Sequence, residues 1–406
     1  MNFNWNPVFN LVMEIKYKFF QKYNKQKEED ISKSKNFKFW VEFLGVKEYS
    51  DFIDNVIINQ QSNLILIKAI TEKVQDDLWN NEKSIYRECR SMIIDLENDN
   101  LVLAPFAKIF NLDEASEVSK ERIKKEIKSA KLFEVTNKLD GTLQSARFYN
   151  NRIIMNDSLY FDPLELPRLA DGYSKLVDNY KNLICENTDY TFSFENISES
   201  DPHFVNYNSN EEGLYLIGMR DIRDGRQLPY KEISLYANKY NIPMPAFEDK
   251  ALEVLLTEGK EVRVIDKEGW VINISLDGYN SKLVKIKVDD YLNIPNSFEE
   301  IVSINTIIRF FDKFDDFICK IPLAVRNECI YKYKELIKIK EILHNHIDSH
   351  YEKSPKKNIT SYMEWVNENV PDYLKEHLKN KYIGNKINVF ADIEVIKKLY
   401  NKEPIY

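Results

Sequence analysis

The sequence predicts an α+β fold in which a β-rich region with antiparallel sheets is followed by an all-α C-terminal domain. Short runs rich in β-branched and aromatic residues, separated by Asn-Asn, Asp-Gly and Pro turns, dominate residues 85–294. Beyond Pro295, apolar residues recur at three- and four-residue spacing, which is the period of an amphipathic helix. We therefore expect an N-terminal region over 1–84, the β-rich domain over 85–294 and the helical domain over 295–406.

The individual elements follow from local patterns. The apolar spacing over residues 8–23 predicts a helix, and the charged segment 117–131 predicts another with a solvated face. Strands are expected over residues 92–96, 132–135, 142–149, 152–155, 191–194, 214–219, 270–274 and 283–288. C-terminal helices are expected over residues 298–319, 323–347, 359–370 and 389–399. Asn358 or Thr360 would cap the third of these helices at its N-terminus.

Composition limits the class of protein. The chain has 406 residues, enough for two domains with substantial cores, and a formal net charge of -8. No overall basic field is available to hold nucleic acid, so any such contact must be local. The four cysteines have no CxxC spacing, which suits a reducing compartment. The N-terminus has neither a signal peptide's apolar core nor a membrane span, and we expect a soluble, cytoplasmic protein without a membrane partner.

Lys138 is the candidate for a reactive residue. It lies two positions before Asp140, in the run VTNKLDGT between two strand-like stretches. Such a turn offers an amine that can attack the α-phosphate of a nucleotide, an aspartate that can orient the amine or a metal ion, and a glycine that lets the backbone turn. A solvated hairpin turn without any chemistry fits the same residues.

A second pattern would supply charges near that lysine. A lysine amine attacks only when neutral, and a pKa near 10.4 leaves about one amine in a thousand neutral near pH 7.4. Lys285 and Lys287 stand two apart on an expected strand and would point to the same face. The Asp277-Gly278 turn would fold this strand back onto the one beginning at Glu268, so that we expect the two cations to lower the pKa of Lys138. An ordinary solvent-facing edge strand is the alternative.

Further cations and carboxylates accompany Lys138 in a definite order. They are Arg90 in ECRSMIID, Lys108 in AKIFNLDE, Glu195 in TFSFEN, Glu268 in EGWVI, and Lys285 and Lys287 in VKIKVDDY. This ordered set resembles the covalent nucleotidyltransferases, the superfamily of polynucleotide ligases and mRNA capping enzymes. Within it, the chain is similar over residues 85–292 to the phage tRNA-repair type of ATP-dependent RNA ligase. The helical tail favours this family, because capping enzymes and DNA ligases usually continue with a β-rich OB-fold.

The resemblance implies a nucleotidyltransferase (adenylation) domain of the ATP-grasp-like ligase type, with ATP as co-substrate and Mg²⁺ or Mn²⁺ as metal. Lys138 would form lysyl-AMP with the help of Asp140. The implied ATP contacts are Arg90 and Lys108 for the triphosphate, Lys285 and Lys287 for the α-phosphate, Glu195 for the ribose, and Ile217 and Val271 for the adenine. Glu268 would bind the metal ion. Tyr291 is a further candidate, for which packing in the core is the simpler interpretation.

The implied reaction joins RNA 5'-phosphate and 3'-hydroxyl ends in RNA or tRNA repair. A nicked tRNA is one candidate substrate, an end-healing kinase or phosphatase a candidate partner, and a monomer the expected state. The alternatives are a DNA ligase, a GTP-dependent capping nucleotidyltransferase, or a non-catalytic RNA-end-binding protein.

Two departures from the family pattern stand out. Where the family usually has a basic segment with Lys and Gly-Ser, this chain has IMNDSL around Asn156, so one phosphate-facing cation is absent or supplied elsewhere. Trp270 follows Glu268-Gly269, where a smaller aromatic residue is common. The histidines of HNHIDSH, His344, His346 and His350, have partly helical i, i+4 spacing, but a polar helix end explains them better than a metal site.

Overall fold

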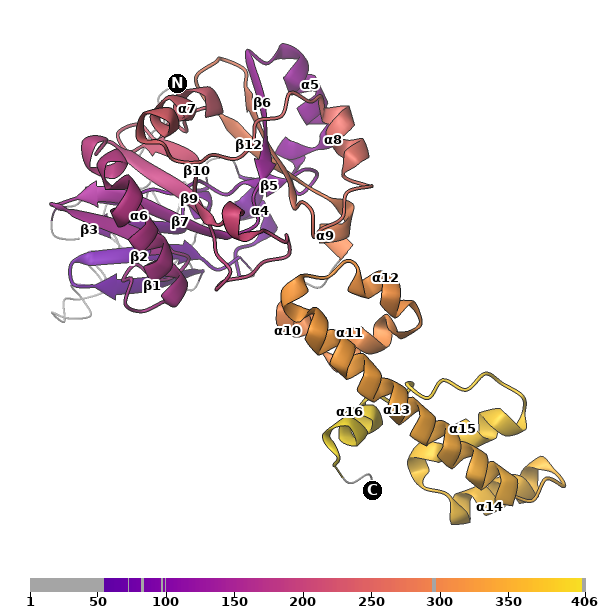
Figure 1. Cartoon of the computed structure of the whole chain (residues 1–406). Coiled ribbons are helices and arrows are strands. Elements are labelled where there is room, and N and C mark those ends of the chain that lie inside the picture. The colour runs from indigo at the N-terminus through magenta and orange to yellow at the C-terminus, as the bar shows by residue number, and fades with distance from the viewer. Residues whose placement is uncertain are drawn as a thin grey trace, which may run out of the picture. The chain divides into compact units, whose positions relative to one another are not determined.

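The computed structural model describes residues 55–71, 73–81, 84–95, 98, 100–293 and 297–403. The helix expected over residues 8–23 lies outside these ranges. The chain divides into two units, Met1–Leu292 and Asn293–Tyr406, which are described separately (Figure 1). The first unit contains strands and helices and the second contains helices alone, so the α+β prediction with antiparallel sheets and an all-α C-terminal part is confirmed.

Three four-stranded sheets build the described part of the first unit. Sheet 1 has the order β1 (Val56–Gln61), β2 (Leu64–Ala69), β3 (Arg90–Asp95) and β4 (Asn100–Leu103). Sheet 2 has the order β10 (Gly213–Asp221), β9 (Tyr190–Ile197), β7 (Thr142–Tyr149) and β8 (Arg152–Asp157). Sheet 3 has the order β5 (Phe110–Asn111), β12 (Lys282–Lys287), β11 (Gly269–Ser275) and β6 (Leu132–Lys138). All neighbours are antiparallel except β5 and β12.

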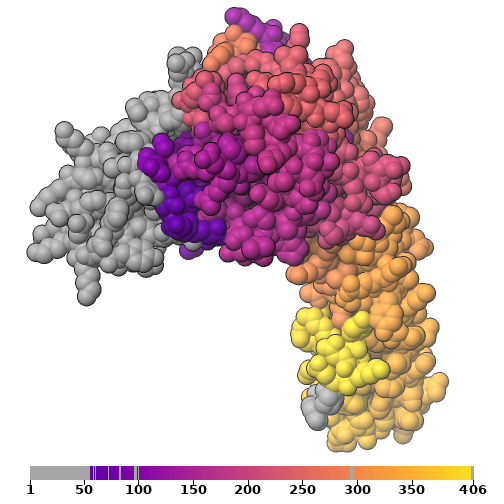
Figure 2. All heavy atoms as spheres, turned by 60° about the vertical axis from the view of Figure 1, so that its left-hand side comes forward, coloured from indigo at the N-terminus to yellow at the C-terminus, as the bar shows by residue number. Residues whose placement is uncertain are grey.

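The helices of this unit are mostly short. They are α4 (Asp76–Asn80), α5 (Lys120–Ser129), α6 (Pro167–Glu186), α7 (Tyr230–Tyr240), α8 (Leu252–Glu258) and α9 (Asp289–Asn293). The longest, α6, buries Leu169, Leu176 and Leu183 in one core with Phe192 and Phe194 of β9. The middle of the chain, magenta in Figure 2, forms a continuous surface on the viewed face of this unit. The sequence analysis did not predict α6 or α7.

The Lys138 segment crosses between sheets. Lys138 ends β6 in sheet 3, whereas Thr142 begins β7 in sheet 2, and these two strands do not pair with each other. The interpretation of this segment as a hairpin turn is therefore wrong. By contrast, β11 and β12 pair antiparallel through the turn at Asp277-Gly278, where glycine has a φ of 79°. The second hairpin thus forms as the sequence predicts.

The second unit is helical throughout its described residues. Its helices are α10 (Phe298–Ile301), α11 (Ile304–Arg309), α12 (Phe314–Ile318), α13 (Leu323–Lys353), α14 (Ile359–Asn369), α15 (Asp372–Tyr382) and α16 (Ile393–Asn401). The helix expected over 298–319 is interrupted, since the Ser303 side chain caps a new helix by accepting from the Thr306 amide. Asn358 caps α14 in the predicted way. Within the described ranges, the helices are too short or too polar to cross a membrane.

Candidate active site

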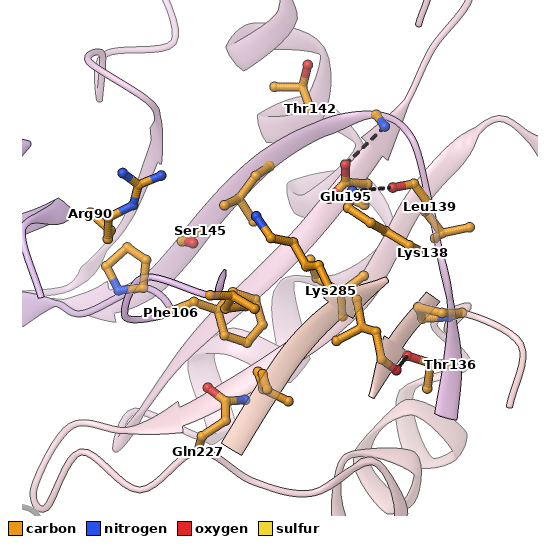
Figure 3. Close-up of a pocket in the computed structure, with 18 of the residues that line it drawn as sticks. Arg90, Phe106, Thr136, Lys138, Leu139, Thr142, Ser145, Glu195, Gln227 and Lys285 are labelled. Carbon is orange, nitrogen blue, oxygen red and sulfur yellow. Dashed lines mark hydrogen bonds between the residues drawn. The ribbon is translucent and has the colours of Figure 1, made fainter. Parts of the chain in front are cut away.

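A cavity of about 540 Å³ in the first unit is lined by residues of all three sheets. Sheet 1 contributes Lys68 and Arg90, sheet 2 contributes Glu195 and Ile217, and sheet 3 contributes Lys138 and Lys285. Figure 3 shows Lys138, Glu195 and Lys285 converging in this space, with Arg90 to one side. The volume is in the range of small-molecule sites.

The pairing of sheet 3 explains which side chains reach the cavity. In one row across β6, β11 and β12, Lys138 lies opposite Gly269 and Gly269 opposite Lys287. The next row on the same face is Thr136, Val271 and Lys285, and the third is Glu134, Asn273 and Leu283. Alternate residues of a strand point to the same face. The second and third rows and Lys138 of the first form one wall of the cavity, whereas Gly269 and Lys287 lie on this face outside the lining. The intervening residues, including Trp270, Ile272 and Ile286, are buried in the core on the other face.

This alternation explains how the chain accommodates Trp270 where a smaller aromatic residue is common in the family. Trp270 is fully buried away from the cavity, and its indole N–H donates to Glu248 at 3.0 Å. A larger aromatic ring at this position therefore adds core packing without filling the site. Gly269 is constrained much more tightly, because its φ is +150° and a Cβ atom would lie 2.0 Å from the Ile286 carbonyl oxygen.

Glu268 joins two of the predicted lysines. Its carboxylate accepts a hydrogen bond from Lys138 Nζ and lies 2.9 Å from Lys287 Nζ, and its side chain is 2% exposed. Burial alone would raise the pKa of Glu268, but the two ammonium groups lower it. Burial alone would likewise lower the pKa of Lys138, but Glu268, then Glu195 and Asp140, raise it. The prediction that neighbouring cations lower the pKa of Lys138 is therefore wrong for the ligand-free protein, because carboxylates surround this amine.

Lys285 has the opposite environment. Burial and repulsion from Lys138 and Lys287 lower its pKa to about 8, against a weaker attraction from Glu114. No described carboxylate lies within ion-pairing distance of its amine. The cation of this wall that lacks a carboxylate partner is thus Lys285, which leaves its charge available to a ligand phosphate.

The remaining carboxylates are held by backbone amides. Asp140 accepts hydrogen bonds from the Phe204 and Val205 amides at 2.8 and 2.9 Å, while burial and Glu268 raise its pKa. Glu195 accepts from the Gly141 amide at 3.0 Å, and burial raises its pKa to about 7. Three carboxylates therefore converge around Lys138 in fixed positions.

The apolar residues predicted for the adenine line the same cavity from different sheets. Val271 lies in β11 of sheet 3. Ile217 lies in β10 of sheet 2, at a shift of register between Leu216 and Gly218. Consecutive residues of a strand point to opposite faces, so Ile217 reaches the cavity while Leu216 stays in the core.

The two upstream cations have different positions. Arg90 lines the cavity, and its guanidinium makes no hydrogen bond or ion pair with the described residues around it. Lys108 is not among the lining residues. Its amine bonds to Glu114 at 2.7 Å and lies 4.6 Å from the Phe110 ring centre. Its charge still contributes to lowering the pKa of Lys285. Lys108 therefore affects the site electrostatically without lining the cavity.

Comparison with known proteins gives the family. A family model described as RNA ligase matches residues 88–292, about half of the chain. The chain belongs to this RNA ligase family. The match begins just before Arg90 and ends after Tyr291, so it includes the ordered set of charged residues from which the resemblance was inferred, and the predicted family is confirmed.

Solved structures show weaker likeness. The RNA ligase of Naegleria gruberi solved with PPi has 17% identity and a TM-score of 0.35, and the match covers 46% of this chain and 56% of that one. An archaeal ATP-dependent RNA ligase has 14% identity and a TM-score of 0.45, covering 86% of this chain and 99% of that one. A putative ATP-dependent DNA ligase from Aquifex aeolicus has 12% identity and a TM-score of 0.41, covering 83% and 98%. No curated protein matches the sequence.

The cavity is also lined by residues that no sequence motif marks. His203 lines the cavity between two acids, with Nδ1 3.8 Å from Asp140 Oδ1 and Nε2 3.6 Å from Asp201 Oδ2. Burial alone would lower the pKa of His203, but the two aspartates raise it. Lys68 and Arg168 line the cavity as well. None of these three lies in a recognisable motif, and only long-range strand pairing and packing bring them to the site.

The histidines that the sequence did single out lie in the second unit. His344, His346 and His350 are all on α13. Among the described residues, no group of three or more His, Cys, Asp or Glu side chains is arranged to hold a metal ion. The three histidines lie toward the C-terminal end of α13, which ends at Lys353, so the segment is helical as predicted.

Proposed function

We propose that this RNA ligase uses ATP and joins a 5'-phosphate to a 3'-hydroxyl RNA end through lysyl-AMP and RNA-adenylate intermediates. The observation that supports this most directly is the placement of Lys138. Its amine lies in a cavity of nucleotide size, next to Glu268, with Lys285 and Lys287 on the same face of sheet 3. A nucleophilic lysine that handles phosphates needs such neighbours to control its proton and to stabilise the transferring group.

In the first step, the neutral amine of Lys138 attacks the α-phosphorus of ATP. A phosphorus–nitrogen bond forms, the bond to the pyrophosphate oxygen breaks, and pyrophosphate leaves with the electron pair, while the nitrogen gives up one proton to a neighbouring carboxylate or to water. Lys285 and Lys287 are assigned to the α-phosphate, where positive charge stabilises the transition state. Glu268 holds the ammonium form of Lys138 before ATP binds, so the amine loses its proton only when the charges around that carboxylate change.

The carboxylates fit a hard divalent cation of the Mg²⁺ or Mn²⁺ type. Mg²⁺ is usually bound by one or two carboxylates together with substrate phosphates, and a site of this kind is the one to expect here, because no three acidic side chains of the described residues are arranged to hold an ion by themselves. We assign the metal contact to Glu268. Such an ion, when bound, supplies positive charge that offsets the carboxylates and polarises a phosphate.

The second and third steps use the same cavity wall. An oxygen of the RNA 5'-phosphate attacks the phosphorus of lysyl-AMP, and the lysine nitrogen leaves as a neutral amine after taking up a proton. The RNA 3'-hydroxyl then attacks the 5'-phosphate of the RNA-adenylate, AMP leaves, and a phosphodiester remains. A nicked tRNA would present both ends, after an end-healing kinase or phosphatase has prepared them. Glu195 is assigned to the ribose, and Ile217 and Val271 to the adenine.

The test is covalent labelling of the full chain. Incubation with α-labelled ATP and Mg²⁺ should give an AMP adduct by intact-mass analysis, and Lys138→Ala should lack it. Lys131→Ala is the matched control, because Lys131 is an exposed lysine directly before β6. Preference for GTP would favour a capping enzyme, sealing of DNA over RNA would favour a DNA ligase, and RNA binding without any adduct would favour a non-catalytic binder.

A further inference from the structure

Two cations that face the cavity sit directly opposite each other in sheet 1. Lys68 of β2 pairs in register with Arg90 of β3, and both line the cavity. Like charges directly across an antiparallel pair repel each other. Such an arrangement is therefore unfavourable in the free protein unless an anion or nearby acid compensates it.

A β-bulge creates this pairing. Ile67 lies opposite Met92, and Lys68 lies opposite Arg90, so Ser91 is the extra residue between them. Ser91 has a φ of 69°, in the left-handed region that side chains other than glycine rarely adopt. Without the bulge, Arg90 would share a face with Met92, which is buried in the core. The strained residue thus turns the arginine from the core side to the cavity side.

The segment that lacks the usual basic residue holds this bulge in place. The Asn156 side-chain amide donates to the Ser91 carbonyl oxygen at 2.6 Å, and the Ser91 hydroxyl donates to the Ser158 carbonyl oxygen. The Lys68 amine donates to the Ser158 hydroxyl at 2.5 Å. The end of β8 therefore positions cations that other elements supply, in place of contributing one itself.

A third cation completes the group. Arg168, near the start of α6, lines the cavity and donates to Asp157 Oδ2 at 2.6 Å. Asp157 is 2% exposed and follows Asn156 directly, whereas the Arg168 side chain is 38% exposed. The aspartate thus fixes the guanidinium beside the bulge while leaving part of it open to a ligand. Asp201 also lies close enough to interact electrostatically with Asp157 and Arg168, so the group combines three positive charges with two negative ones.

We propose that Lys68, Arg90 and Arg168 form a phosphate-binding subsite on the sheet 1 side of the cavity, in which Lys68 and Arg168 replace the missing basic residue near Asn156. The inference rests on the proposed function, since the phosphate belongs either to the pyrophosphate portion of ATP or to the 5'-phosphate of RNA. Both ligands present a phosphate group, which can accept bidentate hydrogen bonds from arginine and form ion pairs with lysine. Arg90 is placed near the triphosphate by the family resemblance, and the structure adds the other two residues.

The experiment measures binding to the full chain, with inorganic pyrophosphate and 5'-phosphorylated RNA as separate probes and no divalent metal. Calorimetric titration of pyrophosphate into Lys68→Ala and Arg168→Ala should show affinity lower by about 10-fold or more, since a hydrogen bond to a charged group is lost. Lys68→Arg should largely restore it. Arg152→Ala is the matched control, because Arg152 is an exposed cation at the start of β8 outside the cavity lining.

The second probe separates the two sources of phosphate. If the subsite takes the RNA end, the same variants should lose the preference for 5'-phosphorylated over 5'-hydroxyl RNA while retaining pyrophosphate affinity. If neither probe distinguishes Lys68→Ala and Arg168→Ala from Arg152→Ala, or if the wild type binds neither probe, the subsite is refuted. A wild type that binds pyrophosphate through these cations but forms no AMP adduct would refute the proposed function and leave the subsite standing.

Discussion

Lys138 and Lys285 lie on the same face of sheet 3, in adjacent rows, and both line the cavity. Their pKa values are nevertheless shifted in opposite directions. The pKa of Lys138 is raised, whereas that of Lys285 is lowered to about 8. Burial lowers the pKa of both, so it cannot explain the difference. The decisive factor is the partner, because Lys138 contacts the Glu268 carboxylate and Lys285 is surrounded mainly by other cations.

The comparison assigns the two lysines different states in the free protein. Lys138 is an ammonium group that cannot attack, and Lys285 is a cation that loses its charge above a pH of about 8. Nucleotide transfer needs the neutral amine of Lys138 and the charged form of Lys285. Because the raised pKa of Lys138 lies above that of Lys285, we expect kcat/KM for adenylation to rise with pH up to about 8 and then to level off, since the gain of neutral Lys138 is offset by the loss of charge on Lys285. A decline should follow only above the pKa of Lys138.

The largest expected effect comes from removing Lys285 altogether. Lys285→Ala should lower the single-turnover rate of lysyl-AMP formation about 100-fold, the usual cost of one lost transition-state contact. Lys287→Ala should also be impaired, and it additionally removes one counter-charge of Glu268. Circular dichroism should exclude misfolding. Near-normal adenylation by both variants would mean that the lysines of β12 do not stabilise the α-phosphate and that other residues do so.

Removing the Glu268 carboxylate should reduce the difference in pKa between Lys138 and Lys285. In Glu268→Gln, Lys138 loses its charged partner, so its pKa should fall by about one unit, equivalent to about 1.4 kcal/mol. The pH above which kcat/KM declines is set by Lys138 and should move down by the same amount. The maximal rate should drop as well, because Glu268 is also assigned to the metal ion. Measuring kcat/KM for ATP across the neutral and alkaline range separates the shift from the drop, and an unchanged position of the high-pH decline would show that Glu268 does not control the proton of Lys138.

A conservative change should remove the limit set by Lys285. Lys285→Arg keeps a positive charge at every accessible pH, because the guanidinium stays protonated. In this variant kcat/KM should therefore continue to rise above the pH of about 8 at which the wild type levels off, with only a modest change below it. Arg and Lys differ in shape, so a lower rate throughout is acceptable. A levelling near a pH of about 8 that persists in this variant would belong to another group.

The sequence predicted those parts of the site that depend on local pattern. The period of two in VKIK placed Lys285 and Lys287 on one face, and the Asp277-Gly278 turn placed them beside Glu268. It could not predict the charge of Lys138, because that charge depends first on Glu268, which the pairing of β11 with β6 brings to the amine, and then on Glu195 of β9. Lys68 was missed for the same reason. Its position opposite Arg90 requires a bulge at Ser91 whose supports, Asn156 and Ser158, are far away in sequence.

Removing the second unit should have the smallest effect on the difference between Lys138 and Lys285. The charged residues of the cavity, from Lys68 to Lys285, all precede Asn293, where that unit begins. A chain ending at Asn293 that keeps its circular dichroism should therefore form lysyl-AMP at a rate close to that of the full chain, with the pH profile unchanged. It should, however, choose differently among RNA ends in sealing assays, since the helical domain is associated with RNA selection in the family it resembles. If the folded truncation joins every tested RNA equally well, the helical unit is not a specificity element. If the rise of kcat/KM ended at a pH other than about 8, charges of the second unit would reach Lys285, so that its lowered pKa would no longer be a property of sheet 3 alone.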